Sequence, residues 1–140
     1  MTPARYLVDN SALARLDVPT AAAHWHSLVQ AGLVGVSVVT ELEVGFSARS
    51  SADYRTTRSR IVERLLAVPL PFRAEARARE VQRLLVERGQ HRAVGVADLL
   101  IAATAEIEGL IVLHYDADFD LVADVTGQPT EWVVPHGSIS

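Results

Sequence analysis

Four acidic side chains stand where apolar segments of this chain begin or end. Asp9 follows the apolar run 6–8, and Asp116 comes shortly after the run 110–113. Glu43 and Asp98 lie near the expected starts of two helices. A buried carboxylate is costly unless it is paired or binds a metal, and several together repel one another until a divalent cation joins them. The four acids therefore indicate a hard-metal site, and such sites commonly serve phosphate chemistry.

The first acid has two possible roles. Asp9 can be a central metal ligand, with Ser11 holding its carboxylate or a bound water. Asp, Asn and Ser are also the residues that cap helices best, so the segment Asp9-Asn10-Ser11 can equally be the start of a helix. Taken alone, this motif does not separate the two interpretations.

Two glutamates compete for the second position. Thr40 and Glu43 have the spacing of a capping box, which predicts that Thr40 caps a helix and that Glu43 lies in its first turn, pointing back over the strand ends. Glu41 is two residues away and faces a different direction on a helix. Glu43 is the first choice for the site and Glu41 the alternate, although either could simply favour the helix N-terminus by its charge.

The third and fourth positions carry stronger signals. Asp98 begins an otherwise apolar helix, and a helix so apolar is expected to be largely buried, so its acid needs a partner. Asp116 and Asp118 alternate just after a strand and can share the metal. Asp120 is expected to be solvated or capping, and His114 to be structural.

The expected elements place these acids at one edge of a sheet. Strands are expected at residues 6–8, 33–39, 110–113 and 132–134, the last at a sheet edge. Helices are expected at residues 11–16, 19–31, from 40 onward, 50–67, 73–88, 97–108 and 119–124. Strands separated by helices predict an α/β fold with a mostly parallel sheet covered on both faces. Sites on such sheets lie beyond the carboxyl ends of the strands.

Composition narrows the class of protein. The chain has 140 residues, which predicts one domain over residues 1–140, and its 49% hydrophobic residues are enough for a core. It has no cysteine, which excludes thiolate zinc sites and disulfide scaffolds and fits a cytoplasmic location. No apolar run is long enough to span a membrane.

The basic residues are unevenly distributed. All thirteen are arginines, and eleven of them lie between residues 49 and 92 beside only five acids. Arginines that hold phosphates beside acids that hold metal would suit a nucleic-acid enzyme, although solvated helix faces would look the same.

Taken together and in this order, the four motifs resemble the PIN-domain ribonucleases, and within them the VapC toxins of toxin–antitoxin pairs. The resemblance covers nearly the whole chain. It rests on the segments Leu7-Val8-Asp9-Asn10-Ser11, Ser37-Val38-Val39-Thr40-Glu41-Leu42-Glu43-Val44-Gly45, Ala97-Asp98-Leu99-Leu100-Ile101-Ala102-Ala103-Thr104-Ala105 and Leu113-His114-Tyr115-Asp116-Ala117-Asp118-Phe119.

The resemblance implies a three-layer α/β/α fold with a twisted, mostly parallel sheet. It also implies an endoribonuclease that uses Mg²⁺ or Mn²⁺, a homodimer, and a cognate VapB-type antitoxin. The acids Asp9, Glu43, Asp98 and Asp116 take the catalytic positions, and Asp9, Asp98, Asp116 and Asp118 are the expected metal ligands. The expected RNA-binding arginines are Arg49, Arg55, Arg58 and Arg92.

Other functions are less consistent with the residues. Phosphotransfer receiver domains use a lysine, and this chain has none. Phosphatases of the haloacid dehalogenase type need an aspartate where Ser11 stands, and no phosphate-binding loop with the Gly-Lys signature is present. The remaining alternative is a PIN-fold binding scaffold without nuclease activity.

Overall fold

One parallel sheet organises the molecule. The computed structural model describes residues 4–139. Its strands are β1 (Tyr6–Val8), β2 (Val34–Ser37), β3 (Leu66–Val68), β4 (Ile111–His114) and β5 (Thr130–Trp132). They lie in the order β3-β2-β1-β4-β5, and every pairing is parallel. The expected α/β fold with a parallel sheet is confirmed, and the last strand lies at an edge as expected.

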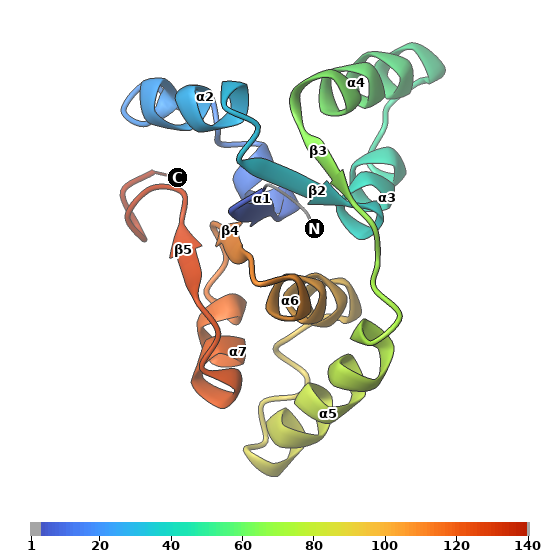
Figure 1. The fold of residues 1–140 in the computed structure, drawn as a ribbon, viewed down its shortest axis with the longest axis vertical. Coiled ribbons are helices and arrows are strands. Elements are labelled where there is room, and N and C mark those ends of the chain that lie inside the picture. Colours follow the sequence, from blue (N-terminus) through green and yellow to red (C-terminus); the bar gives the residue numbers. More distant parts are fainter. Residues whose placement is uncertain (1–3, 140) are drawn as a thin grey trace.

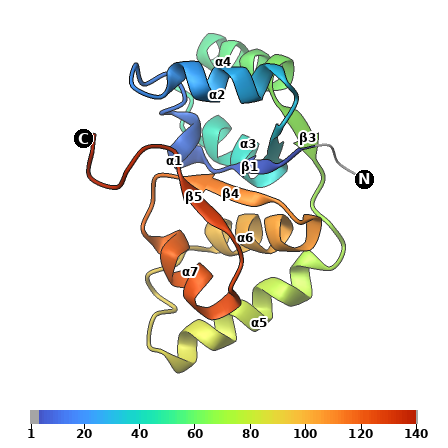
Figure 2. The same ribbon diagram turned by 60° about the vertical axis from the view of Figure 1, so that its left-hand side comes forward.

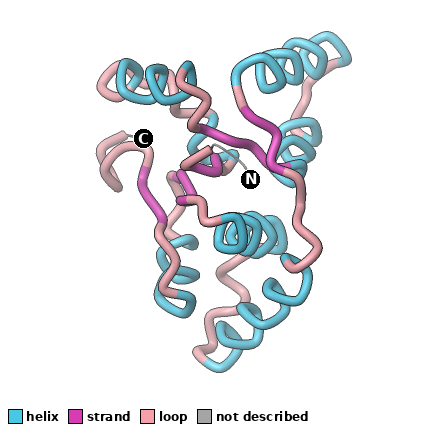
Figure 3. Tube along the Cα trace, in the orientation of Figure 1, coloured by secondary structure: helices cyan, strands magenta, loops and turns pink. Residues whose placement is uncertain are grey.

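Helices cover both faces of this sheet (Figures 1 and 2). On one side lie α1 (Asn10–Leu13), α2 (Ala22–Gln30) and α4 (Ser51–Arg64). On the other lie α5 (Ala74–Glu87), α6 (Val96–Glu108) and α7 (Asp118–Thr126). The sheet runs between them as the middle layer (Figure 3), with α3 (Val38–Phe46) following β2 directly.

Alternation along the strands explains the two cores. Successive strand residues point to opposite faces of a sheet. Leu7 accordingly packs with Val112 and the α5–α7 layer, whereas Tyr6 and Val8 pack with the α1, α2 and α4 layer. Because both faces are covered, β1 is buried at every position. A strand buried on both faces is what the apolar run 6–8 predicted.

One strand was missed by the sequence prediction. The helix expected over 50–67 includes residues 66 and 67, but α4 ends at Arg64 and β3 begins at Leu66. No turn residue separates the two elements, so the sequence carries no break there. The strand packs closely on β2, since a Cβ on Gly35 would stand only 2.5 Å from Val68 Cγ2.

The start of α3 also differs from the prediction. Ser37, not Thr40, is the N-cap: its hydroxyl accepts the Thr40 N–H, and its backbone is extended. The strand expected over 33–39 therefore ends two residues earlier, because the chain turns into the helix at Ser37. Glu41 lies in the first helical turn and Glu43 in the next, so the predicted capping box is wrong.

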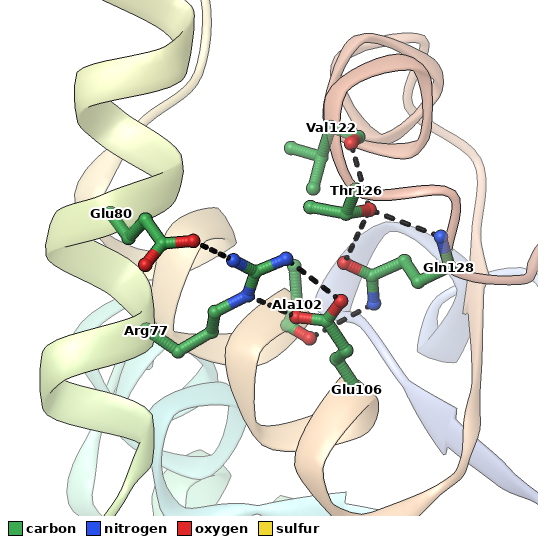
Figure 4. Close-up of polar contacts among 7 residues, drawn as sticks. All are labelled: Arg77, Glu80, Ala102, Glu106, Val122, Thr126 and Gln128. Carbon is green, nitrogen blue, oxygen red and sulfur yellow. Dashed lines mark hydrogen bonds and ion pairs between the residues drawn. The ribbon is translucent and has the colours of Figure 1, made fainter.

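The α5–α7 layer is fastened by polar contacts (Figure 4). The Arg77 guanidinium donates to both carboxylate oxygens of Glu106, at 2.6 and 3.0 Å, and also pairs with Glu80. The buried Gln128 side chain donates to the Ala102 carbonyl at 2.9 Å, which ties the end of α7 to α6. These contacts hold α6, the helix that carries Asp98, against its neighbours.

Among residues 4–139, no helix combines the length and apolarity needed to cross a membrane. Residues 1–3 and 140 lie outside the described part of the chain, so the single domain over residues 1–140 stays a prediction.

Candidate metal centre

The carboxyl ends of β1 and β4 bring the first acids together. The two strands are neighbours, and the Asp9 N–H donates to the Leu113 carbonyl at 2.9 Å, which extends the pairing past the end of β1. Asp9 is 4% exposed. Its carboxylate also accepts the Ser11 N–H, so the helix-capping interpretation of Asp9 holds alongside its place in the acidic cluster.

Ser11 links the two strand ends through its side chain. Its hydroxyl donates to Asp9 Oδ2 at 2.6 Å and accepts the Tyr115 N–H at 2.9 Å. Tyr115 directly precedes Asp116, so one hydroxyl fixes the distance between the two acid-bearing segments. This agrees with the supporting role expected for Ser11.

Arg15 and Tyr115 reinforce this link and were not identified from the sequence. The Arg15 guanidinium lies 4.6 Å from the centre of the Tyr115 ring and donates to the Ser11 carbonyl at 2.6 Å. The Tyr115 hydroxyl in turn donates to the Ile139 carbonyl. Only the adjacency of β1 and β4 brings these residues together.

The two glutamates of α3 have different surroundings. Glu41 forms an ion pair with Arg58 of α4. Glu43 has a buried carboxylate oxygen with no hydrogen-bond partner among the described residues. Burial raises the pKa of Glu43, and the nearby charge of Asp9 raises it further. Geometry therefore directs Glu43, rather than Glu41, toward the other acids.

Thr40 fixes the helix that carries Glu43. It is fully buried, and its hydroxyl donates to the Val8 carbonyl at 3.3 Å, one residue before Asp9. The contact joins the first turn of α3 to the end of β1. Thr40 was expected to cap the helix, but it connects the helix to the strand.

Asp98 approaches the same place from α6. It lies in the first turn of that helix, after the N-cap Gly95, whose backbone is extended. Burial raises the pKa of Asp98 to about 7, and the charges of Asp9, Asp116, Glu43 and Asp118 all act in the same direction. In the metal-free protein, Asp98 thus keeps its proton to a much higher pH than an ordinary aspartate does.

Asp116 and Asp118 complete the cluster. The Asp116 carboxylate accepts the Asp118 N–H at 2.9 Å, which fixes the turn before α7. Burial raises the pKa of Asp118, followed by the charge and hydrogen bonding of Asp116. Oxygens of Asp98, Asp116 and Asp118 all lie within 4.8 Å of one another.

This donor set fits a hard divalent cation. It offers only carboxylate oxygens, the ligands that Mg²⁺ and Mn²⁺ prefer. Asp9 and Glu43 are outside the group of three close acids, but their charges act on Asp98. A cation among the acids would compensate the repulsion that raises the pKa of Asp98 and would give the buried Glu43 oxygen a partner. The structure thus brings Asp98, Asp116 and Asp118 within 4.8 Å of one another and places Asp9 and Glu43 close enough to act on Asp98 by their charges.

The expected RNA-binding arginines are more dispersed. All four are exposed. Arg49 and Arg55 lie at the start of α4, Arg92 precedes α6, and Arg58 is already paired with Glu41. Their role stays a prediction, with Arg58 the least available of the four.

The comparison with a family model agrees with this geometry. Residues 6–125, which carry every acid of the cluster, match the PIN domain model. The chain belongs to the PIN domain family. Its place in the VapC group of this family follows from Mycobacterium tuberculosis relatives. Ribonuclease VapC2 is 48% identical over 134 residues, covering 94% of each chain, and Ribonuclease VapC51 is 45% identical over 138 residues, covering 96% of this chain and 97% of that one.

Solved structures show the same PIN fold at lower sequence identity. The DNA-bound VapBC of Salmonella typhimurium superposes with a TM-score of 0.77 at 18% identity, over 94% of this chain and 99% of that chain. VapBC-1 of nontypeable Haemophilus influenzae superposes with a TM-score of 0.75 at 16% sequence identity, over 91% of this chain and 97% of that chain. The resemblance inferred from the four motifs is confirmed.

Proposed function

We propose that this PIN domain is a metal-dependent endoribonuclease and the toxin of a VapBC-type toxin–antitoxin pair. The observation that carries the proposal is the cluster of Asp9, Glu43, Asp98, Asp116 and Asp118 at the carboxyl ends of β1 and β4. Relatives named ribonuclease VapC, at 40–48% identity over nearly the full chain, support the activity.

The acids divide the work in this proposal. Asp98, Asp116 and Asp118 would hold a divalent ion directly, and Asp9 and Glu43 would bind it or orient water beside it. A divalent ion bound there lowers the pKa of a coordinated water and stabilises negative charge on the phosphate. A bound cation would favour the ionised form of Asp98, whose pKa is raised by burial and by the neighbouring carboxylates, so Asp98 would lose its proton on binding.

Mg²⁺ and Mn²⁺ are the ions we propose. The acids provide oxygen ligands alone, and the chain has no cysteine to favour softer metals. His114, the histidine nearest in sequence to the cluster, uses Nδ1 to accept the Asp116 N–H. A zinc-type site with imidazole ligands is therefore not what these residues offer.

Two protein partners belong to the proposal. The solved neighbours are VapBC complexes, so we expect a VapB-type antitoxin to bind this chain. We also expect a homodimer. Val38, Leu42 and Phe46 follow one another a turn apart on α3 and are 43%, 68% and 93% exposed, an apolar stripe suited to such contacts.

Cleavage of cellular RNA by the purified chain tests the proposal. RNA is incubated with protein and Mg²⁺ or Mn²⁺, with a chelator control, and the fragment ends are mapped. Discrete fragments that form only with metal support a ribonuclease. If the folded, partner-free protein binds an antitoxin but cleaves nothing with either metal, the scaffold alternative is correct.

A further inference from the structure

Among the described residues, His114 is a buried titratable residue near the cluster that the proposed reaction does not use. It is the last residue of β4 and has no exposed surface. Its ring packs beside Phe119 and Trp132, with ring centres 5.1 and 4.9 Å away. The sequence suggested only that this residue is structural.

One ring nitrogen has a specific partner. Nδ1 lies 3.2 Å from the backbone nitrogen of Asp116 and accepts its N–H. An imidazole nitrogen that accepts a hydrogen bond carries no proton, so the proton of the neutral ring is on Nε2.

The other ring nitrogen is unsatisfied. Nε2 is buried and has no hydrogen-bond partner among the described residues. An unpaired buried N–H is unfavourable, because the group has lost its hydrogen bond to water and gained none in return. Packing alone does not account for histidine here, because phenylalanine would occupy nearly the same space without that penalty. The distinguishing property of the imidazole at this position is the acceptor at Nδ1.

That acceptor begins a short relay along the chain. His114 accepts the N–H of Asp116, and the Asp116 carboxylate accepts the N–H of Asp118. Each side chain thus fixes the backbone two residues ahead, in the manner of successive Asx-type turns. The relay ends on the two acids that lie within 4.8 Å of Asp98.

We propose that His114 is a positioning residue, whose Nδ1 holds the 114–118 turn in the shape that presents Asp116 and Asp118 to a divalent ion. It does not bind the ion. The inference rests on the proposed metal site, and it predicts that the acceptor matters more for metal binding than the ring does. Groups that orient metal ligands typically change metal affinity by about 10–100-fold when they are removed.

Two variants separate the acceptor from the ring. His114→Phe keeps an aromatic ring between Phe119 and Trp132 but has no acceptor. His114→Asn places an oxygen close to the position of Nδ1 but loses most of the ring. Mn²⁺ affinity is measured by calorimetry and unfolding by denaturant, with wild type alongside.

We expect opposite orders in the two measurements. The phenylalanine variant should be as stable as wild type and bind Mn²⁺ about 10-fold or more weakly. The asparagine variant should be less stable but bind Mn²⁺ within about threefold of wild type. The proposal would be overturned if the phenylalanine variant bound Mn²⁺ as tightly as wild type does. It would also be overturned if Mn²⁺ affinity fell in step with the free energy of unfolding in both variants. His114→Leu and His114→Thr provide the same comparison if either variant does not fold, since threonine can accept the N–H and leucine cannot.

Amide hydrogen exchange at Asp116 gives a readout without metal or RNA. Exchange should be slow in wild type and the asparagine variant and faster in the phenylalanine variant. Unchanged exchange in the phenylalanine variant would reject the positioning role. If exchange behaves as expected while wild type neither binds Mn²⁺ nor cleaves RNA, the role of His114 in the turn stands and the proposed function fails.

Discussion

Arg58 of α4 forms an ion pair with Glu41 of α3, and this contact distinguishes the two glutamates of that helix. Glu43, two residues further on, has a buried carboxylate oxygen without a hydrogen-bond partner among the described residues. Burial raises the pKa of Glu43, and the charge of Asp9 raises it further. The sequence left Glu41 as an alternate for the site. The environments favour a structural role for Glu41 and a role in the metal centre for Glu43.

Glu43→Gln and Glu41→Gln are therefore a matched pair. Glu43→Gln should lower the rate of RNA cleavage on the order of 100-fold or more, because it removes a charge beside the metal or its water. The cleavage rate of Glu41→Gln should stay within about threefold of wild type. Glu41 pairs with Arg58 rather than with the other acids, and losing a partly exposed ion pair has little effect on folding. Initial rates with saturating Mg²⁺ decide the matter, and a reversed order would assign the site to Glu41.

Ser11→Ala should loosen the link between the strand ends. Without the hydroxyl, Asp9 Oδ2 loses a donor and the Tyr115 N–H loses its acceptor. We expect Mn²⁺ affinity to fall about 10-fold and the free energy of unfolding to fall by about 1–2 kcal/mol. Ser59→Ala is the control, because the exposed Ser59 hydroxyl donates a hydrogen bond to Glu63 within α4 and lies away from the acids of the metal centre. If the two variants had the same Mn²⁺ affinity and the same free energy of unfolding, Ser11 would not organise the site.

The raised pKa of Asp98 predicts how metal-free stability depends on pH. The ordinary value is 3.8 and the folded value is about 7, so between these pH values the unfolded chain loses a proton that the folded protein keeps. Stability contributed by this group is therefore present below about pH 4 and is lost as pH rises to about 7. The pKa values of Glu43 and Asp118 are shifted in the same direction.

A bound divalent ion should oppose this loss of stability at higher pH. A divalent ion binds the ionised acids, so the rise in melting temperature on adding Mg²⁺ should grow from pH 5 to pH 8. Melting curves at several pH values, with and without Mg²⁺, measure both effects, and Asp98→Asn should flatten them. A Mg²⁺ effect that is the same at pH 5 and pH 8 would contradict a carboxylate site with this titration.

The sequence predicted what depends on local pattern. The apolar runs at β1 and β4, the apolar helix α6 and the alternating acids Asp116 and Asp118 are each recognisable within a few residues. These segments predicted the parallel sheet and the place of the acids. The acids were expected to lie close together because the functional sites of parallel sheets lie beyond the carboxyl ends of the strands.

What the sequence did not show depends on contacts between distant segments or on where one element ends. β3 follows α4 without a turn residue, and the cap at Ser37 was hidden by the more familiar spacing of Thr40 and Glu43. The pairing of Glu41 with Arg58 requires the packing of α3 on α4. The bridge from Ser11 to Tyr115 requires β1 beside β4.

Arg77 should affect stability without affecting the chemistry. Its partly buried guanidinium joins α5 to Glu106 of α6, and this contact raises the pKa of Arg77 (Figure 4). Arg77→Met should lower the free energy of unfolding by about 1–3 kcal/mol, while cleavage per folded molecule stays within about twofold. Arg79→Met is the control, because its exposed pair with Glu75 is expected to contribute less than about 1 kcal/mol. A large loss of cleavage in folded Arg77→Met would mean that the α5–α6 contact also shapes the metal centre.

The most direct test of the metal centre is the cleavage rate of Asp98→Asn, measured with saturating Mg²⁺ beside the unfolding free energy of the same preparation. Asp98 lies among all the other acids, so its charge is both needed for the metal and unfavourable without it. We predict that cleavage falls on the order of 100-fold or more, and that the metal-free stability at pH 8 equals or exceeds that of wild type. Cleavage at the wild-type rate by the folded variant would contradict the assignment of these carboxylates as the catalytic metal site.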